Sequence, residues 1–320
     1  MDMQIETAQI AKRVMAIQNN ISKVIIGKEA VFQKLMAAFL AGGNVLLEDM
    51  PGTGKTKLAK ALAASLDASF GRIQFTPDLL PSDVTGLNIF RQDKGIFEFT
   101  PGPVFCNILL ADEINRATPR TQSSLLECME ERQVTVDGVT RTMEQPFFLI
   151  ATQNPVETTG TYPLPEAQID RFAMQLSMGY PTLQEELMII DRYQTEDPLE
   201  ELKPVCSCEE LLQMQQICRR VYVSERVREY LVQIVQATRE HTALMMGVNP
   251  RGTLSYLHCV QAYAAIQGRE YVTPDDVKKL CVPALGHRIV SYRTGQGGTA
   301  QEILQGILDT VPVPTEEWTR

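Results

Sequence analysis

The stretch EDMPGTGKT, residues 48–56, constrains the fold of this chain more than any other part of the sequence. It comes after the apolar run NVLLE and before the helical repeat TKLAKALAASL. This order of strand, glycine-rich loop and helix is the one that a phosphate-binding loop requires. Asp49 departs from the pattern G-x-x-x-x-G-K-[ST], because it stands where the first glycine is usual, at the base of the loop. A solvent-exposed glycine turn is the alternative interpretation.

The residue types of the loop suit a phosphate group. Gly52 and Gly54 allow positive φ and a close backbone approach, so successive N–H groups can point at one anion. The helix that is expected to begin near Lys55 adds the positive end of its dipole. Lys55 is placed to reach the β- and γ-phosphates, and the Thr56 hydroxyl is placed to bind Mg²⁺. The loop therefore predicts a nucleotide site with a magnesium ion.

Three continuous apolar runs predict central strands of a parallel sheet. The runs are Asn44–Glu48, Asn107–Glu113 and Phe147–Pro155. None of them alternates apolar with polar residues, which suits strands that are buried on both faces. Helical repeats lie between the runs. Strands that alternate with helices predict an α/β fold in which helices cover both faces of the sheet.

Polar residues end two of these runs, at the carboxyl ends of strands, where parallel sheets bind ligands. Asp112 is expected to hold Mg²⁺, directly or through water, and Glu113 to activate the attacking water as general base. The two adjacent carboxylates would repel each other unless a cation lies between them. Asn154, at the tip of a neighbouring strand, is expected to orient the same water. A solvated strand end is the alternative for the carboxylate pair.

Beyond MGYPT, residues 178–182, the pattern changes to helix-like segments, and no strand is predicted. These segments are Leu183–Tyr193, Cys208–Arg220, Ser224–Glu240, Gly252–Gln267, Thr273–His287 and Gln301–Leu308. We therefore expect an α/β nucleotide-binding core over residues 1–180 and an all-α helical bundle over residues 181–320.

Two arginines complete the predicted site. Arg171, in PEAQIDRF, lies at the edge of the α/β part, from where it can reach the γ-phosphate of a neighbour if subunits form a ring. A surface ion pair with Asp170 or Glu166 is the alternative. Arg251, in GVNPRGT, is predicted at a helix start, where it can report the nucleotide state to the second domain. Its alternative is a surface charge at that helix start.

Composition argues against several classes of protein. The formal net charge is −9, whereas domains that grip nucleic-acid phosphates are usually basic, so no nucleic-acid partner is expected. No stretch approaches the about 18 apolar residues of a membrane span, and the acidic start of the chain is not a secretory signal. The seven cysteines are scattered without a zinc-binding pattern, so we expect reduced thiols and a cytoplasmic protein. Structural roles are expected for the three histidines, which are His241, His258 and His287.

Seven stretches of the sequence, in their usual order, resemble the MoxR family of AAA+ ATPases over nearly the whole chain. They are VIIGKEAV, LLEDMPGTGKT, RIQFTPDLLPSDVTG, FEFTPGPVF, LLADEINRATPRTQSSLLECMEERQVTV, FFLIATQNPVETTGTYPLPEAQIDRF and YVTPDDVKKL. The family often has Glu and a variable residue ahead of PGxGKT, so Asp49 agrees with its habit. The resemblance implies an AAA+ P-loop NTPase core, with a parallel sheet in an αβα sandwich, followed by an all-α helical lid domain.

The resemblance also implies roles for individual residues. The ATP-binding residues that it implies are Ile26, Gly27, Pro51, Gly52, Thr53, Gly54, Lys55, Thr56 and Lys57. Asp112 and Glu113 correspond to the Walker B motif, and Asn154 to sensor 1. Arg171 corresponds to the arginine finger. Arg251 corresponds to sensor 2, which acts on the nucleotide of its own subunit or of a neighbour.

Two segments are predicted to form β-hairpins. Leu87–Phe99 alternates apolar residues around Asp93-Lys94-Gly95. Gln133–Gln145 carries Asp137-Gly138, a signal for a type I′ turn. The family has the first hairpin as an insertion that faces the ring pore and can touch a client, and the second ahead of the sensor 1 strand. The alternative is that both are structural hairpins that shape the ring.

The resemblance implies an ATP-hydrolysing hexameric ring that remodels or matures protein complexes, with clients that carry von Willebrand factor A domains. A nucleotide-dependent assembly switch with little turnover is a second interpretation, and Glu113 argues against it because a pure binder does not need that carboxylate. A motor on DNA is a third. The acidic balance and the lack of a segment rich in Arg and Lys argue against it.

Overall fold

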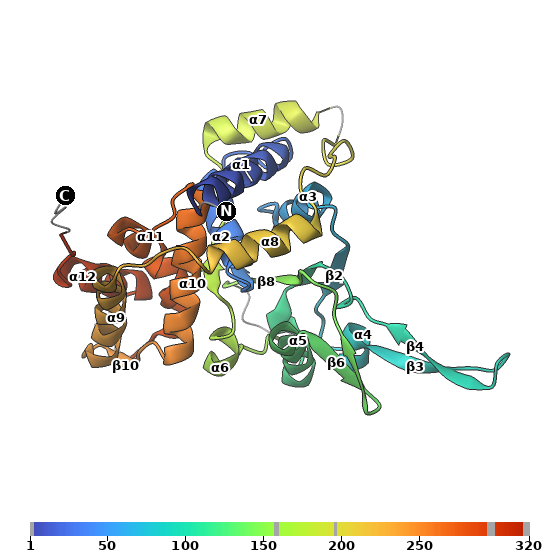
Figure 1. Cartoon of the computed structure of the whole chain (residues 1–320). Helices are drawn as coiled ribbons and strands as arrows, with labels where there is room; N and C mark the ends of the chain where they lie inside the picture. The colour runs from blue at the N-terminus through green and yellow to red at the C-terminus, as the bar shows by residue number, and fades with distance from the viewer. Residues whose placement is uncertain (1–2, 157–159, 195–196, 293–297, 316–320) are drawn as a thin grey trace.

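The computed structural model describes residues 3–156, 160–194, 197–292 and 298–315. Its central feature is a five-stranded parallel sheet with the strand order β2-β5-β8-β1-β9 (Figure 1). The strands are β1 (Val45–Glu48), β2 (Phe70–Gln74), β5 (Ile108–Asp112), β8 (Phe148–Gln153) and β9 (Met174–Leu176). The three strands in the middle are the three predicted apolar runs, so that prediction is confirmed.

Helices cover both faces of this sheet, as the αβα prediction requires. In the part of the chain before the last strand of the sheet they are α1 (Met3–Ile21), α2 (Glu29–Leu40), α3 (Lys55–Ser65), α4 (Pro81–Thr85), η1 (Ile114–Arg116), α5 (Pro119–Glu131) and α6 (Glu166–Ile169). One buried cluster packs under α5 on one face of the sheet. A second cluster covers the other face and continues through α1 and α2 into the C-terminal helices. No helix within the described ranges is long and apolar enough to cross a lipid bilayer.

The C-terminal part is helical, and its predicted helices are confirmed within a few residues. They are α7 (Leu183–Tyr193), α8 (Cys208–Cys218), α9 (Glu225–Glu240), α10 (Pro250–Ile266), α11 (Pro274–Leu285), η2 (Gly286–Arg288) and α12 (Ala300–Thr310). The expectation of no strand in this part was wrong, because β10 (Leu244–Met246) pairs with β11 (Val290–Ser291). Strands of two or three residues are too short to show a periodic signal. The boundary at residue 180 stays a prediction.

Both predicted hairpins are present. They are β3–β4 (Gly86–Arg91 with Ile96–Pro101) and β6–β7 (Gln133–Val136 with Val139–Thr142). Asp137 and Gly138 both have positive φ, as a type I′ turn requires. The β3–β4 hairpin extends far from the body of the molecule (Figure 1), and the Nδ2 of Asn88 donates to Asp137 Oδ2 at 2.6 Å, which joins the two hairpins.

All seven cysteines are free, and six of them are buried. Burial raises the pKa of the Cys106, Cys128, Cys206, Cys218, Cys259 and Cys281 thiols to about 12. Thiols with such pKa values stay protonated and inert at neutral pH. This agrees with the expectation of buried, reduced cysteines.

His287 lies at the contact between the sheet and the C-terminal helices, where its surroundings predict that stability depends on pH. Its Nε2 is 2.9 Å from the carbonyl oxygen of Phe172. Burial, together with the charge of Arg288, lowers the pKa of His287 to about 3. The folded state therefore holds a neutral ring where the unfolded chain takes up a proton below about pH 6.5. The stability that depends on the neutral ring is present above that pH, and it is lost as the pH falls toward 3.

As the pH is lowered, we expect the free energy of unfolding of the wild type to fall more steeply than that of His287→Gln. The difference in slope should approach about 1.4 kcal/mol per pH unit between about pH 6 and pH 4, since one proton is taken up on unfolding. Urea unfolding at a series of pH values measures both slopes. Equal slopes would show that the His287 ring is not held in its neutral form in the folded protein.

Candidate functional site

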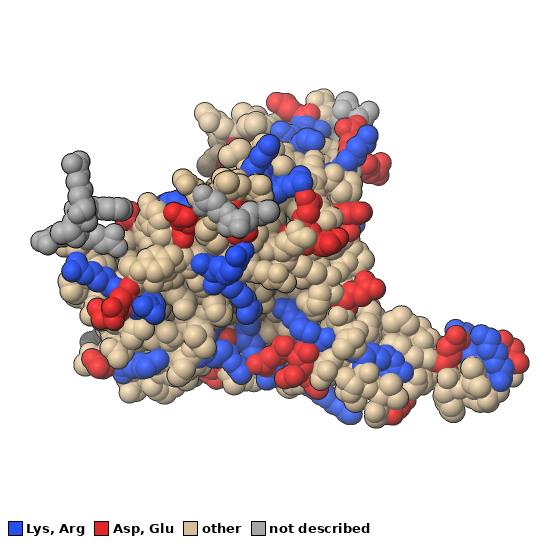
Figure 2. All heavy atoms as spheres, viewed as in Figure 1, with Lys and Arg blue, Asp and Glu red and all other residues tan. Residues whose placement is uncertain are grey.

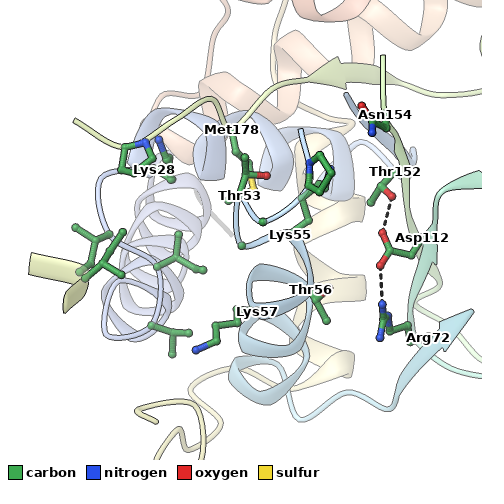
Figure 3. Close-up of a pocket in the computed structure, with 18 of the residues that line it drawn as sticks. Lys28, Thr53, Lys55, Thr56, Lys57, Arg72, Asp112, Thr152, Asn154 and Met178 are labelled. Carbon is green, nitrogen blue, oxygen red and sulfur yellow. Dashed lines mark hydrogen bonds and ion pairs between the residues drawn. The ribbon is translucent and has the colours of Figure 1, made fainter. Parts of the chain in front are cut away.

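A pocket of about 640 Å³ opens at the carboxyl ends of the central strands (Figure 3). This volume is within the range of sites that bind a small molecule. The predicted site residues that line it are Ile26, Pro51, Gly52, Thr53, Gly54, Lys55, Thr56, Lys57, Asp112, Glu113 and Asn154. The structure thus brings together residues from three separate strand ends, as the sequence predicts. Gly27, Arg171 and Arg251 are not among the residues that line the pocket.

The glycine-rich loop has the backbone that the sequence predicts. Gly52 and Gly54 have φ values of 84° and 89°, in the region that favours glycine. The helix α3 begins at Lys55, so its unpaired N–H groups lie at the pocket. The Lys55 ammonium donates to the carbonyl oxygens of Asp49 and Met50, at 2.8 and 3.3 Å. The lysine is therefore folded along its own loop.

Asp49, the residue that departs from the usual loop pattern, binds the segment that follows the neighbouring strand β9. Its carboxylate is buried and accepts hydrogen bonds from Ser177 Oγ at 2.6 Å, Met178 N at 2.8 Å and Gly179 N at 3.0 Å. A glycine at this position has no side chain to make these bonds. Asp49 therefore connects the base of the loop to the segment between β9 and α7.

Each carboxylate of the Asp112–Glu113 pair has its own arginine. Asp112 Oδ2 accepts from Arg72 Nη2 at 2.8 Å, and its Oδ1 accepts from Thr152 Oγ1 at 2.7 Å. Glu113 Oε2 lies 2.9 Å from Arg116 Nε. The expectation that the pair needs a cation between the two carboxylates was thus too narrow, because these arginines supply the positive charge.

Sequence reasoning missed the polar groups that β2 contributes. Gln74 Nε2 donates to Glu113 Oε2 at 2.8 Å, and Arg72 lines the pocket beside Asp112 (Figure 3). The sequence held little signal for them, because the apolar residues that identify a buried strand are few in FGRIQ. An edge strand has one neighbour and needs no continuous apolar run.

The other end of the pocket is apolar, and α7 lies along it. Its lining includes Val24, Ile25, Ile26, Met178, Pro181, Ile189 and Tyr193. The Tyr193 hydroxyl donates to the carbonyl oxygen of Val24 at 2.9 Å, and the Lys57 ammonium lies 3.5 Å from the centre of the Tyr193 ring. An apolar end beside a phosphate loop suits a flat base such as adenine.

Gly27 contributes to this end without lining the cavity. Its φ is 70°, and a Cβ built on it would lie 1.7 Å from Glu185 Oε1 of α7. The positive φ favours glycine here, and the atoms nearest to the built Cβ belong to the side chain of Glu185. Its predicted contact with the nucleotide stays a prediction.

The residues present fit a magnesium ion. Mg²⁺ in nucleotide sites is held by one or two protein oxygens together with phosphate oxygens and water. The Thr56 hydroxyl and the Asp112 carboxylate line the same pocket, and both are oxygen ligands. Within the described ranges there is no group of three or more His, Cys, Asp or Glu residues that would form a metal site made of protein ligands alone.

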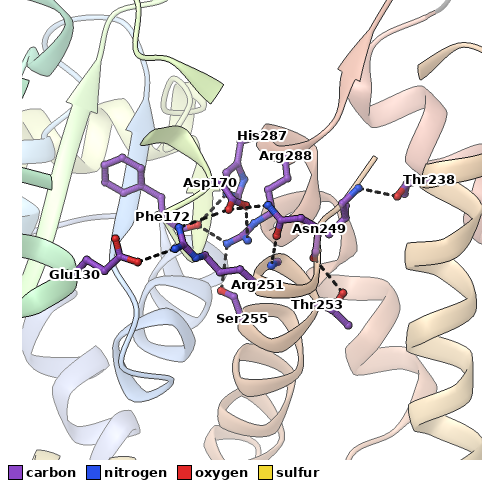
Figure 4. A network of polar contacts seen from close by, with 12 residues as sticks. Glu130, Asp170, Phe172, Thr238, Asn249, Arg251, Thr253, Ser255, His287 and Arg288 are labelled. Atoms are coloured by element: carbon purple, nitrogen blue, oxygen red, sulfur yellow. Dashed lines mark hydrogen bonds and ion pairs between the residues drawn. The ribbon is translucent and has the colours of Figure 1, made fainter. Parts of the chain in front are cut away.

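The two predicted arginines meet at a carboxylate that sequence analysis did not select. Arg171 Nη1 forms an ion pair with Glu130 Oε2. Arg251 Nη2 lies 2.9 Å from Glu130 Oε1 (Figure 4). The partners proposed for Arg171 as alternatives, Asp170 and Glu166, were wrong, because its partner is Glu130. Arg251 stands at the start of α10, as predicted.

A buried network fixes the backbone near both arginines. Asp170 Oδ1 accepts from Arg288 Nη1 at 2.9 Å, and its Oδ2 accepts from Asn249 Nδ2 at 2.8 Å. Asn249 is also the N-cap of α10, since its Oδ1 accepts from Gly252 N at 2.8 Å. The carboxylate of Asp170, which is next to Arg171 in the sequence, therefore holds the start of α10 and the end of η2 against the edge of the sheet.

We expect Lys55→Ala to weaken ATP binding by about 10–100-fold, since a hydrogen bond to a charged group contributes about 1.5–3 kcal/mol. Equilibrium binding of a fluorescent ATP analogue measures the change. Lys60→Ala, which removes an exposed lysine of the same helix, is the matched control and should bind as the wild type does. Unchanged ATP binding by Lys55→Ala would show that Lys55 does not bind the phosphates.

The sheet order, the phosphate loop and the carboxylates at the end of β5 define a P-loop ATPase of the AAA class. A model of the ATPase family associated with various cellular activities matches residues 44–174, and a model of the AAA lid domain matches residues 236–307. The chain belongs to the MoxR family of AAA+ ATPases.

Relatives with known sequences or structures agree with this assignment. The chain is 39% identical over 305 residues to the chaperone MoxR1 of Mycobacterium tuberculosis, which covers 92% of this chain and 80% of that protein. It is 48% identical over 299 residues to the uncharacterized protein YeaC of Bacillus subtilis, which covers 93% of each. A crystal structure from Cytophaga hutchinsonii, of a protein assigned as an ATPase, has a TM-score of 0.90 and 36% identity, and the match covers 97% of both chains.

Proposed function

We propose that this ATPase works in the cytoplasm as a ring, hexameric by the family expectation, whose sites form between subunits and require Mg²⁺. Each subunit supplies the phosphate loop, Asp112 and Glu113 to its own nucleotide. Its neighbour supplies Arg171 and Arg251. The observation that carries this proposal is the position of the two arginines, which meet at Glu130 and do not line the pocket of their own chain.

The residues of the pocket have the chemistry that ATP hydrolysis needs. The loop N–H groups and Lys55 hold the phosphates, and Mg²⁺ bound by Thr56 and Asp112 would neutralise charge on them. Glu113 takes the proton of the attacking water, which Asn154 orients. Arg171 of the neighbour stabilises the charge that develops on the γ-phosphoryl group as its bond to ADP breaks.

We propose protein complexes as the clients, and among them proteins with von Willebrand factor A domains. The chaperone name of the mycobacterial relative supports a remodelling role. The β3–β4 hairpin supports contact with a protein, because it extends from the body of the molecule and Phe97 near its tip is 71% exposed. Lys and Arg are interspersed with Asp and Glu on the face shown in Figure 2, which does not favour a nucleic-acid partner.

An ATP-dependent assembly switch with little turnover is the second candidate. It shares the pocket and the ring, and it differs only in the use of Glu113. A slow switch would bind ATP, assemble and stay assembled, so its release of phosphate would be the same with Glu113 and with Gln at this position.

Steady-state ATP hydrolysis over a range of protein concentrations tests the proposal. Turnover per subunit should rise with protein concentration and then level off, because an isolated subunit has no neighbour to supply Arg171 and Arg251 to its site. It should also stop when Mg²⁺ is chelated. Constant turnover down to concentrations at which sedimentation shows monomers would contradict the shared site. ATP binding without turnover at any concentration would favour the switch.

A further inference from the structure

Glu130, in the last turn of α5, is the one carboxylate among the described residues that forms an ion pair with both Arg171 and Arg251 at hydrogen-bonding distance. Arg171 follows α6 and Arg251 begins α10, so the two guanidinium groups come from segments that are far apart in the sequence. Two positive groups repel each other at short range. They lie side by side here because each binds a different oxygen of the same carboxylate.

The stability of the fold does not explain this arrangement. The side chains are 31% exposed for Arg171, 54% for Arg251 and 32% for Glu130. Ion pairs that water reaches to this extent contribute about 0–1 kcal/mol each. The deeper Asp170–Arg288 pair, with Arg288 buried, already fixes the contact between the sheet and the helices. The main effect of Glu130 is therefore on the positions of the Arg171 and Arg251 guanidinium groups, and not on the stability of the fold.

Glu130 leaves N–H donors of both arginines available for a second anion. A guanidinium has five N–H donors in a fixed plane. Arg171 uses Nη1 for Glu130 and for the Leu126 carbonyl oxygen at 3.3 Å. Arg251 uses Nη2 for Glu130, while its Nη1 lies 3.9 Å from Asp170 Oδ2, too far for a hydrogen bond. The arginines can thus keep Glu130 and bind a phosphate at the same time.

We propose that Glu130 is the positioning residue that holds Arg171 and Arg251 side by side for a single phosphoryl group of the neighbouring subunit's nucleotide. This inference rests on the proposed shared site. Each guanidinium group keeps its positive charge and has N–H donors that Glu130 does not use, and these can bind a phosphate. Without the carboxylate, repulsion separates the two guanidinium groups, and fewer rings present both to one phosphate.

A mixture of two inactive variants isolates this role. The donor carries Lys55→Ala, so its own site binds ATP poorly while its arginines are intact. The acceptor carries Arg171→Ala and Arg251→Ala, so its site binds ATP but it offers no arginine to a neighbour. Activity in the mixture arises where the donor's arginines face the acceptor's site. Glu130→Gln is then introduced into the donor alone, where its effect on ATP hydrolysis can only reach the neighbour's nucleotide.

We expect Glu130→Gln in the donor to lower the kcat of the mixture about tenfold and to leave the KM for ATP unchanged, as loss of positioning should. Glu209→Gln in the donor, at an exposed position on α8, is the control and should leave the mixture at the parent level. In a donor that already carries Arg251→Ala, Glu130→Gln should cost less, because there is no second guanidinium group to hold. Thermal unfolding of each donor confirms that it is folded.

The possible outcomes separate the two proposals. An active mixture that Glu130→Gln does not slow would overturn the role of Glu130 and leave the shared site intact. Faster turnover with Glu130→Gln would also overturn it, since the carboxylate would then compete with the phosphate. An inactive parent mixture would overturn the shared site itself, and the role of Glu130 with it.

Discussion

Glu113→Gln is expected to bind ATP as the wild type does and to hydrolyse it about 10²–10⁴-fold more slowly, because the amide cannot take the proton of the attacking water. The substitution keeps the shape of the side chain. Its amide oxygen can still accept from Gln74 Nε2, which lies 2.8 Å from Glu113 Oε2. The phosphate loop is unchanged, so the loss should be in kcat alone.

Phosphate release in steady state, beside equilibrium binding of a labelled ATP, measures the two effects separately. Glu209→Gln, at an exposed position on α8, is the matched control and should behave as the wild type. Hydrolysis at the wild-type rate by Glu113→Gln would remove Glu113 as the base. It would also favour the assembly switch if that rate is itself close to zero.

Arg171→Ala should lower turnover about 10³-fold or more, since an arginine finger contributes 10³–10⁵ to kcat in related phosphoryl transfers. The affinity of a single subunit for ATP should hardly change, because Arg171 does not line the pocket of its own chain. The turnover of Arg171→Lys should lie between those of the wild type and Arg171→Ala, because a lysine keeps the positive charge but has no planar set of N–H donors.

Turnover at saturating protein concentration and ATP affinity at low concentration distinguish these effects. The control is Arg228→Ala, which removes an exposed arginine of α9 and should change neither quantity. A large loss of ATP affinity in Arg171→Ala, measured on monomers, would place the arginine at its own nucleotide. A normal turnover would end its assignment as the finger.

Much of the fold could be predicted because its signals are local. The central strands β1, β5 and β8 are continuous apolar runs, and burial on both faces requires such runs. The helices of the C-terminal part carry their own caps, as Thr273 does for α11. The two edge strands, β2 and β9, were not predicted, because one side of each is unpaired and their sequences need no apolar run.

The residues of the candidate site also divide into those that local sequence predicts and those that it does not. Gly52, Gly54, Lys55, Asp112 and Asn154 were predicted from short stretches of sequence, and the structure places all of them on one pocket. Their proximity follows from the topology of a parallel sheet, in which strand ends gather at one edge.

The polar partners were not predictable from sequence. Nothing near Asp49 indicates that it binds the segment after β9, and nothing near Arg72 places it beside Asp112. Glu130 is one of several acids on α5, and only the tertiary packing that brings the start of α10 beside the end of α5 makes it the partner of Arg251.

By itself, the sequence determined the class of protein, the phosphate loop and the carboxylates at the strand end, because each depends on backbone preferences and periodicity within a few residues. The tertiary structure alone decided which charges pair, and that the two arginines lie away from their own nucleotide pocket. The physical reason is that an ion pair between distant segments depends on how whole elements pack, and local propensity carries no information about that.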